Sequence, residues 1–137
     1  MRKVAVLVTR GELNHIIQVV TLLMAATVAE AAVRVLFRDE AVLSITTRGA
    51  RHLPLSARLR PHATAIRARL KHHDMNDLPT MLQTVKGHGD VRLWACRSSL
   101  LLYGVSADAL LPEIDGVQGL TAFVIDEMAT ADQVWTF

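Results

Sequence analysis

The sequence predicts an α/β fold: a three-layer α/β/α sandwich on a mainly parallel sheet of about five strands. Short apolar segments rich in β-branched residues alternate with longer segments of helical composition along the chain. One helix separates the first two strand-like segments, as in a βαβ unit. The 137 residues are 51% hydrophobic and only 4% aromatic, which suits a core of Val, Leu, Ala and Ile.

The first two strands and the helix between them have the clearest patterns. "KVAVLVT" (3–9) is a β-branched apolar run that ends at Arg10-Gly11, the pattern of a parallel strand buried on both faces. A long alanine-rich helix is predicted from Leu13 to near Ala31, and the alternating segment "AVRVLF" (32–37) predicts the second strand. These three segments form the predicted βαβ unit.

The connection from the second to the third strand is predicted to be mostly helical. A short helix is expected at 39–46, followed by an irregular loop at 47–61 that contains glycine and proline. Two further helices are expected at 62–73 and 76–89, the second with Pro79 in its first turn.

The last third of the chain begins with the strand "VRLWAC" (91–96). The elements after it are a helix at 98–104, a turn at 105–117 with a short strand around Val117, a helix at 120–131 and a final strand at 133–137. No internal repeat and no linker interrupts this order. We therefore expect a single domain over residues 1–137.

Charge and cysteine content exclude several kinds of site. The net charge is +2, and much of the basic excess lies between Arg48 and His73, with no acidic residue before Asp74. Because this segment has no aromatic ring to stack on bases, we expect a solvated or protein-docking surface and no nucleic-acid partner. Cys96 is the only cysteine, which excludes an intramolecular disulfide and a multi-cysteine zinc site. Without a glycine-rich phosphate loop or an H-E-x-x-H motif, we expect no metal and no cofactor.

The apolar segment Leu13–Val33 approaches the length of a membrane span of about 20 residues. It carries Asn14, His15 and Glu30, so a helix buried by a sheet and a partner subunit explains it better, and we expect no membrane segment. The apolar run near the N-terminus is too short for a signal peptide. We therefore expect a cytoplasmic protein, in which a thiol stays reduced.

Polar residues follow three of the predicted strands, at the edge of a parallel sheet where ligands bind. They are Thr9-Arg10-Gly11, Arg38-Asp39-Glu40 and Cys96-Arg97-Ser98-Ser99. At the third, the start of a helix and the charge of Arg97 would stabilise a thiolate at Cys96. Position alone leaves two interpretations open: a reactive thiol, or a small side chain that only packs.

Several segments occur in a characteristic order: a first strand ending in "TRG", "VLFRDEAV" at the second strand, then "LWAC…YGV…LLPEIDGV…FVIDEMATADQVWTF". This ordered set resembles the DsrE/DsrF/TusD-like sulfur-relay proteins over nearly the whole chain. The resemblance implies a cytoplasmic α/β domain that assembles into a trimer or hexamer. It also implies that Cys96 accepts sulfane sulfur as a persulfide or thiosulfonate and passes it to a small partner of the TusA type, without a metal or cofactor.

We therefore predict a sulfur carrier or sulfurtransferase with Cys96 as the catalytic residue and Arg97, Arg10 and Ser98 as residues that bind the sulfur donor. Charge and position suggest the two arginines. Some relatives carry a second cysteine near the first; here no second thiol exists, so an internal disulfide cannot resolve the intermediate. The alternative function is a non-catalytic oligomeric subunit or a small-ligand-binding module of the same fold.

Overall fold

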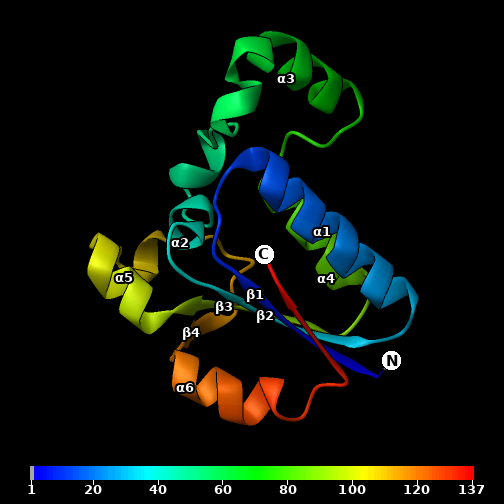
Figure 1. The fold of residues 1–137 in the computed structure, drawn as a ribbon, viewed down its shortest axis with the longest axis vertical. Coiled ribbons are helices and arrows are strands. Elements are labelled where there is room, and N and C mark those ends of the chain that lie inside the picture. The colour runs from blue at the N-terminus through cyan, green and yellow to red at the C-terminus, as the bar shows by residue number, and fades with distance from the viewer. Residues whose placement is uncertain (1) are drawn as a thin grey trace.

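The computed structural model describes residues 2–137 as one five-stranded parallel sheet with helices on both of its faces (Figure 1). The strand order across the sheet is β4-β3-β2-β1-β5. The strands are β1 (Lys3–Val8), β2 (Ala32–Phe37), β3 (Val91–Cys96), β4 (Gly116–Gln118) and β5 (Gln133–Thr136). Every adjacent pair is parallel, which confirms the predicted three-layer α/β fold.

The helices follow the predicted order closely. They are α1 (Leu13–Val28), α2 (Ala41–Ser44), α3 (Ala63–His72), α4 (Leu78–His88), α5 (Arg97–Tyr103) and α6 (Leu120–Phe123). Short 3₁₀ turns occupy parts of the segments predicted as loop or turn: η1 (Gly49–Arg51), η2 (Ala57–His62) and η3 (Ala107–Ala109).

Two helices end differently from the prediction. The first helix stops at Val28, before Ala31, because Glu30 adopts a left-handed φ of 62° that turns the chain toward β2. The helix expected at 120–131 is α6 followed by a π-helical turn, η4 (Val124–Met128), in which the N–H of Ala129 donates to the carbonyl of Val124 at 2.9 Å. Such turns are rare and occur often at functional sites.

Strand alternation divides the core into two layers. Val4, Val6 and Val8 of β1 lie in the larger cluster, together with residues of α1 and α4. Ala5 lies in a small second cluster with Phe123 of α6. Figure 1 shows α1 and α4 on one side of the sheet and α6 on the other, so α6 provides most of the cover on its side.

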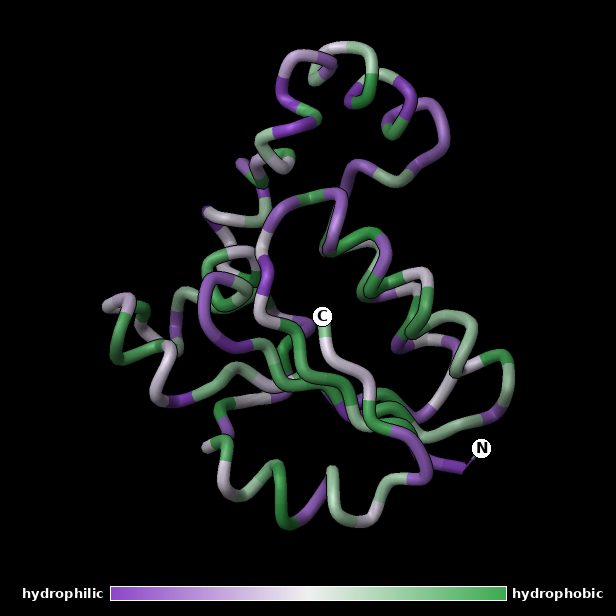
Figure 2. The backbone as a smooth tube through the Cα atoms, viewed as in Figure 1, coloured by the Kyte–Doolittle hydropathy of each residue, from purple (hydrophilic) through white to green (hydrophobic). Residues whose placement is uncertain are grey.

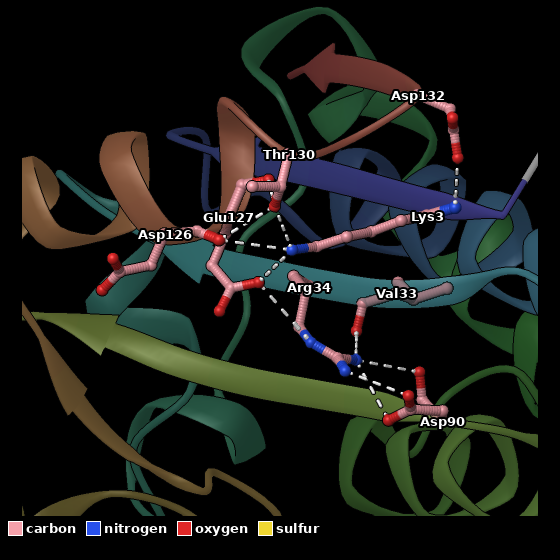
Figure 3. Close-up of polar contacts among 8 residues, drawn as sticks. All are labelled: Lys3, Val33, Arg34, Asp90, Asp126, Glu127, Thr130 and Asp132. Atoms are coloured by element: carbon pink, nitrogen blue, oxygen red, sulfur yellow. Dashed lines mark hydrogen bonds and ion pairs between the residues drawn. The ribbon is translucent and has the colours of Figure 1, made fainter.

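Charged side chains fix the C-terminal part of the α6 layer to the sheet (Figure 3). Glu127 forms ion pairs with Lys3 and Arg34: its Oε2 lies 2.8 Å from Lys3 Nζ and 3.6 Å from Arg34 Nε. The Arg34 guanidinium also binds the carboxylate of Asp90 through two bonds of 3.0 Å. Glu127 and its two cationic partners are largely buried, with side-chain exposures of 15–22%. Removal of the carboxylate would leave Lys3 without its counter-charge and Arg34 with Asp90 as its remaining one.

We expect Glu127→Gln to lower the free energy of unfolding by about 2 kcal/mol, because breaking a largely buried ion pair leaves the partner charge uncompensated. Urea denaturation measures the loss. Asp126→Asn is the matched control, because Asp126 is exposed and its carboxylate forms no ion pair among residues 2–137. Equal losses in the two variants would contradict the assigned role of Glu127.

Most of the basic segment from Arg48 to His73, including α3, is exposed, whereas Leu53 and Leu55 within it are buried in the core. No residue of η1, η2 or α3 is buried, and α3 lies at one end of the molecule in Figure 1. Figure 2 shows largely hydrophobic central strands and recurrent hydrophilic positions around α3. Within residues 2–137, no helix has the length and apolar character needed to cross a membrane.

Candidate functional site

Cys96 is the last residue of β3 and the residue directly before α5. Val91, Leu93 and Ala95 of this strand belong to the larger core cluster, so the alternate residues Trp94 and Cys96 face the α6 layer. There the thiol packs with Leu36 and Phe123, and its residue is 0% exposed. The strand pattern thus places the only thiol beneath the start of α6.

Hydrogen bonds favour the ionised form of this thiol. Burial on its own raises the pKa of Cys96, but bonds from Ser98, Ser99 and Arg38 outweigh it and lower the pKa from 9.0 to about 7. Ser98 Oγ lies 3.3 Å from the sulfur. Ser99, through its backbone N–H and its hydroxyl, and Arg38 also lower the pKa of the thiol, but of these three residues only Ser98 has hydrogen-bonding geometry to the sulfur. At neutral pH a large fraction of Cys96 is therefore the thiolate, the nucleophilic form.

The neighbouring strands place two further polar side chains beside Cys96. Phe37 pairs with Ala95 in register, so Arg38 follows β2 at the level of Cys96, and Gln118 of β4 pairs with Cys96 directly. Arg38 Nε and Gln118 Oε1 are buried and have no hydrogen-bond partner within residues 2–137. Unsatisfied polar atoms on both sides of a thiol are unusual for a purely structural position, because each costs free energy in the absence of a ligand.

A surface pocket of about 720 Å³ opens between the starts of α5 and α6. Arg97 and Ser98 line one side, and Gly119, Leu120 and Thr121 line the other. Cys96 does not itself line this pocket, but its sulfur lies 3.3 Å from Oγ of Ser98, which does. The structure thus brings together three of the four predicted site residues: Cys96, Arg97 and Ser98.

Arg10 lies at a different place. It lines a separate pocket of about 590 Å³ with Tyr103 and Arg60, and its guanidinium lies 3.3 Å from Glu12 Oε2. The reason is the strand order: β2 lies between β1 and β3, so the end of β1 is two strand spacings, about 10 Å, from the end of β3. Arg38, from the strand adjacent to β3, takes the position beside the thiol.

Sequence reasoning placed Arg38 at the correct edge of the sheet but did not assign it to the site. The missing information was the strand order: Arg38 follows β2, which is adjacent to β3, whereas Arg10 follows β1, one strand further away. Among residues 2–137, no three His, Cys, Asp or Glu side chains are close enough together to hold a metal ion. Ser98 and Arg38 offer hydrogen-bond donors beside Cys96, which suit an anion, whereas the unpaired Oε1 of Gln118 is an acceptor.

We expect the rate of Cys96 alkylation by iodoacetamide to rise with pH around a midpoint near 7, compared with about 8.5 for an unperturbed thiol. The lowered pKa also makes stability depend on pH. An acid with a depressed pKa stabilises the folded state fully above its pKa in the unfolded chain, and this contribution is lost as the pH falls to about 7.

Urea denaturation of the wild type and of Cys96→Ser from pH 7 to 9 measures that contribution. The stability difference between them should grow in favour of the wild type as the pH rises. A pH-independent difference, together with an alkylation midpoint near 8.5, would show that the thiol is not activated.

Comparison with known proteins gives a family and a fold. The model of the DsrE/DsrF-like family matches residues 2–137. No curated protein matches the sequence. A solved structure described as a protein of unknown function, MTH1491 from Methanobacterium thermoautotrophicum, is 13% identical and superposes with a TM-score of 0.67, covering 98% of this chain and 99% of that one. At this identity the similarity indicates a shared fold.

Proposed function

Because the chain belongs to the DsrE/DsrF-like family, whose members generally work in sulfur relay, we propose that it carries sulfane sulfur on Cys96 and passes it to a partner protein. The observation that carries the proposal is the thiol itself. It is the only cysteine in the chain, its pKa is lowered to about 7, and its sulfur lies 3.3 Å from Oγ of Ser98, a residue that lines a surface pocket. These properties match a nucleophile better than a packing residue.

The reaction proceeds by thiol exchange in two balanced steps. The Cys96 thiolate attacks the outer sulfur of a persulfide donor, R–S–SH, so a Cys96–S–SH persulfide forms and the donor leaves as its thiolate, R–S⁻. A thiolate of the partner then attacks the outer sulfur of Cys96–S–SH. The partner becomes the persulfide, and Cys96 returns as the thiolate.

Donors with an anionic end fit the charged side chains near the pocket. Arg97 and Ser98 are exposed on its wall, and Arg38, whose Nε is buried, lies on the β2 side of the thiol. In the proposed mechanism these residues bind the anionic part of a persulfide or thiosulfonate donor, and Arg38 takes the role that the sequence suggested for Arg10. No metal or cofactor takes part in either step.

We also propose that the partner is a small sulfur-carrier protein of the TusA type and that the protein acts in the cytoplasm as a trimer or hexamer. Large apolar side chains close to the pocket support a protein–protein contact there. Leu101 and Leu102 of α5 are 79% and 74% exposed, and Ile125, which lines the pocket, is 62% exposed. Exposed apolar side chains of this size mark interaction surfaces.

The experiment is intact-protein mass spectrometry after incubation of the wild-type protein with tetrathionate or an organic persulfide at pH 7. We expect one adduct per chain that dithiothreitol removes. If neither donor produces a reducible adduct under conditions in which the protein stays folded, the sulfur-carrier function is wrong.

The second candidate function, a non-catalytic subunit of the same fold, is favoured by one observation: Cys96 is 0% exposed. A structural cysteine reacts with alkylating reagents only after unfolding. The two functions therefore predict different results for thiol titration under native conditions, with reaction in the absence of denaturant expected for the sulfur carrier.

A further inference from the structure

A pocket of about 630 Å³ opens beside the start of α4. Its wall includes Asp77 and Gln83 of the α4 segment, Arg51 of η1, and Leu111 and Glu113 in the turn before β4. Leu111 belongs to the larger core cluster and Cys96 to the smaller one, so this pocket lies on the α4 side of the sheet and the thiol on the α6 side (Figure 1). The volume is within the range of small-molecule sites.

Glu113 is a buried carboxylate on the wall of this pocket whose hydrogen bonds are incomplete. The residue is 9% exposed. Its Oε1 accepts a hydrogen bond from Gln83 Nε2 at 2.9 Å, but its Oε2 is buried and has no hydrogen-bond partner within residues 2–137. An unpaired oxygen of a buried carboxylate costs free energy, and most such atoms in folded proteins are paired. The free oxygen therefore points to a partner that comes from outside the chain.

The charge of Glu113 is also incompletely balanced. Within residues 2–137 it forms no ion pair. The ammonium of Lys86 donates to the backbone carbonyl of Glu113 at 2.9 Å and to Asp115 Oδ1 at 2.6 Å. One positive charge thus serves two carboxylates. The same two bonds tie the turn that contains Glu113 to α4, so the carboxylate is held at the pocket.

Other acceptors lie on the same wall. Because a carboxylate only accepts, Gln83 presents its NH₂ group to Glu113 and keeps its own carbonyl oxygen free. Asp77, the N-cap residue of α4, accepts the Thr80 hydroxyl on Oδ2 at 2.8 Å and keeps Oδ1 free. A primary ammonium group has three N–H donors and one positive charge. It would supply both the hydrogen bond and the counter-charge that Glu113 lacks.

The pocket has a single Lys or Arg on its wall, Arg51. This residue is exposed, and its guanidinium forms no ion pair and no hydrogen bond within residues 2–137. A free guanidinium binds a carboxylate with two parallel hydrogen bonds. The pocket therefore offers acceptors for a cationic group and a donor for an anionic one.

We propose that this pocket binds a small zwitterion, either a free amino acid or a short peptide, with the ammonium group on Glu113 and the carboxylate on Arg51. The inference goes beyond the sulfur-carrier function and does not depend on it, since Cys96 faces the other side of the sheet.

The experiment is a titration of the ¹⁵N-labelled full-length protein at pH 7, followed by the NMR signals of its backbone amides. The probes are L-alanine and tri-L-alanine. We expect the amides of Arg51, Gln83 and Glu113 to shift and to saturate with at least one of the two probes. Saturation by L-alanine identifies the ligand as an amino acid, and saturation by tri-L-alanine alone identifies it as a peptide.

Modified probes test the two charged contacts. N-acetylation removes the ammonium group of the probe that binds, and C-terminal amidation removes its carboxylate. Each modification should weaken binding about tenfold or more, because it deletes one charge-assisted contact.

Variants test the same contacts from the side of the protein. Glu113→Gln and Arg51→Gln should each weaken the unmodified probe about tenfold. The N-acetylated probe should bind Glu113→Gln as it binds the wild type, since the ammonium that Glu113 would contact is already absent. Arg58→Gln is the matched control, because Arg58 is an exposed arginine of the neighbouring η2 that does not line the pocket.

Stability and sulfur loading distinguish a ligand site from a structural role. Glu113→Gln keeps the oxygen that accepts from Gln83 and removes an incompletely balanced buried charge. Its urea midpoint should therefore equal or exceed that of the wild type, in contrast to Glu127→Gln. Adduct formation on Cys96 with tetrathionate should be unchanged in Glu113→Gln.

The proposal is overturned if neither probe shifts the amides of the pocket, or if the N-acetylated probe binds as tightly as the unmodified one. A loss of stability in Glu113→Gln as large as that in Glu127→Gln would also overturn it, because Glu113 would then be a structural residue. Failure of sulfur loading on the wild type would overturn the proposed function and leave this site unaffected.

Discussion

Cys96→Ser is expected to abolish sulfur loading completely. A serine hydroxyl is not ionised at neutral pH and cannot form the sulfur–sulfur bond that stores sulfane sulfur. Because Cys96 is the only cysteine in the chain, no other thiol can take up the adduct. Intact-protein mass spectrometry after tetrathionate treatment should show one adduct on the wild type and none on the variant.

Folding of the variant must be established separately. The sulfur is buried among Ala5, Leu36 and Phe123, so a serine there introduces a polar group into an apolar cluster and costs about 1–2 kcal/mol. Cys96→Ala is the matched control for this effect, because it avoids the buried hydroxyl. A reducible adduct on either folded variant would place the reactive group elsewhere and contradict the account.

Phe123→Ala is expected to produce the largest loss of stability, about 3–5 kcal/mol. Phe123 is fully buried in the cluster that contains Cys96. Its ring centroid lies 6.2 Å from that of Trp94 in an edge-to-face arrangement. Truncation leaves a cavity directly above the thiol and removes the main contact of α6 with this part of the sheet. Denaturant unfolding measures the loss, and Phe123→Leu provides a milder variant if the alanine variant does not fold.

The same substitution should expose Cys96. We expect the native-state alkylation rate to rise in Phe123→Ala or Phe123→Leu while its pH midpoint stays near that of the wild type. Leu82→Ala is the control, since Leu82 of α4 is fully buried in the cluster on the opposite face of the sheet. If Leu82→Ala accelerated alkylation as much as an equally destabilising Phe123 variant, access to the thiol would depend on global unfolding and not on α6.

The positions of the strands and of Cys96 could be predicted because they depend on local patterns. β1 and β2 are β-branched runs of six residues, and each ends where polar residues begin. "VRLWAC" has the same pattern, so the end of β3 and the start of α5 were predicted within one residue or two. The long apolar sequence of α1 likewise indicates that this helix covers one face of the sheet.

The neighbours of the thiol could not be predicted in this way, because they depend on strand order and on the conformation of single turns. Arg10 and Arg38 follow equivalent strands, and only the order β3-β2-β1 decides that Arg38 lies beside Cys96. The left-handed conformation of Asp39 and its bonds to Ser99 and Tyr103 join segments 60 or more residues apart. No local pattern specifies such contacts.

The most direct test of the central claim follows one sulfur through the relay. The wild-type protein is loaded with an organic persulfide and separated from the donor, and the protein is then incubated with a thiol acceptor such as glutathione. Intact-protein mass spectrometry and assay of the acceptor persulfide follow the two partners together. We predict that the adduct on Cys96 disappears as an equal amount of acceptor persulfide forms, leaving the free thiol ready to load again. An adduct that persists, or that is lost without persulfide on the acceptor, would contradict the assignment of Cys96 as a sulfur carrier.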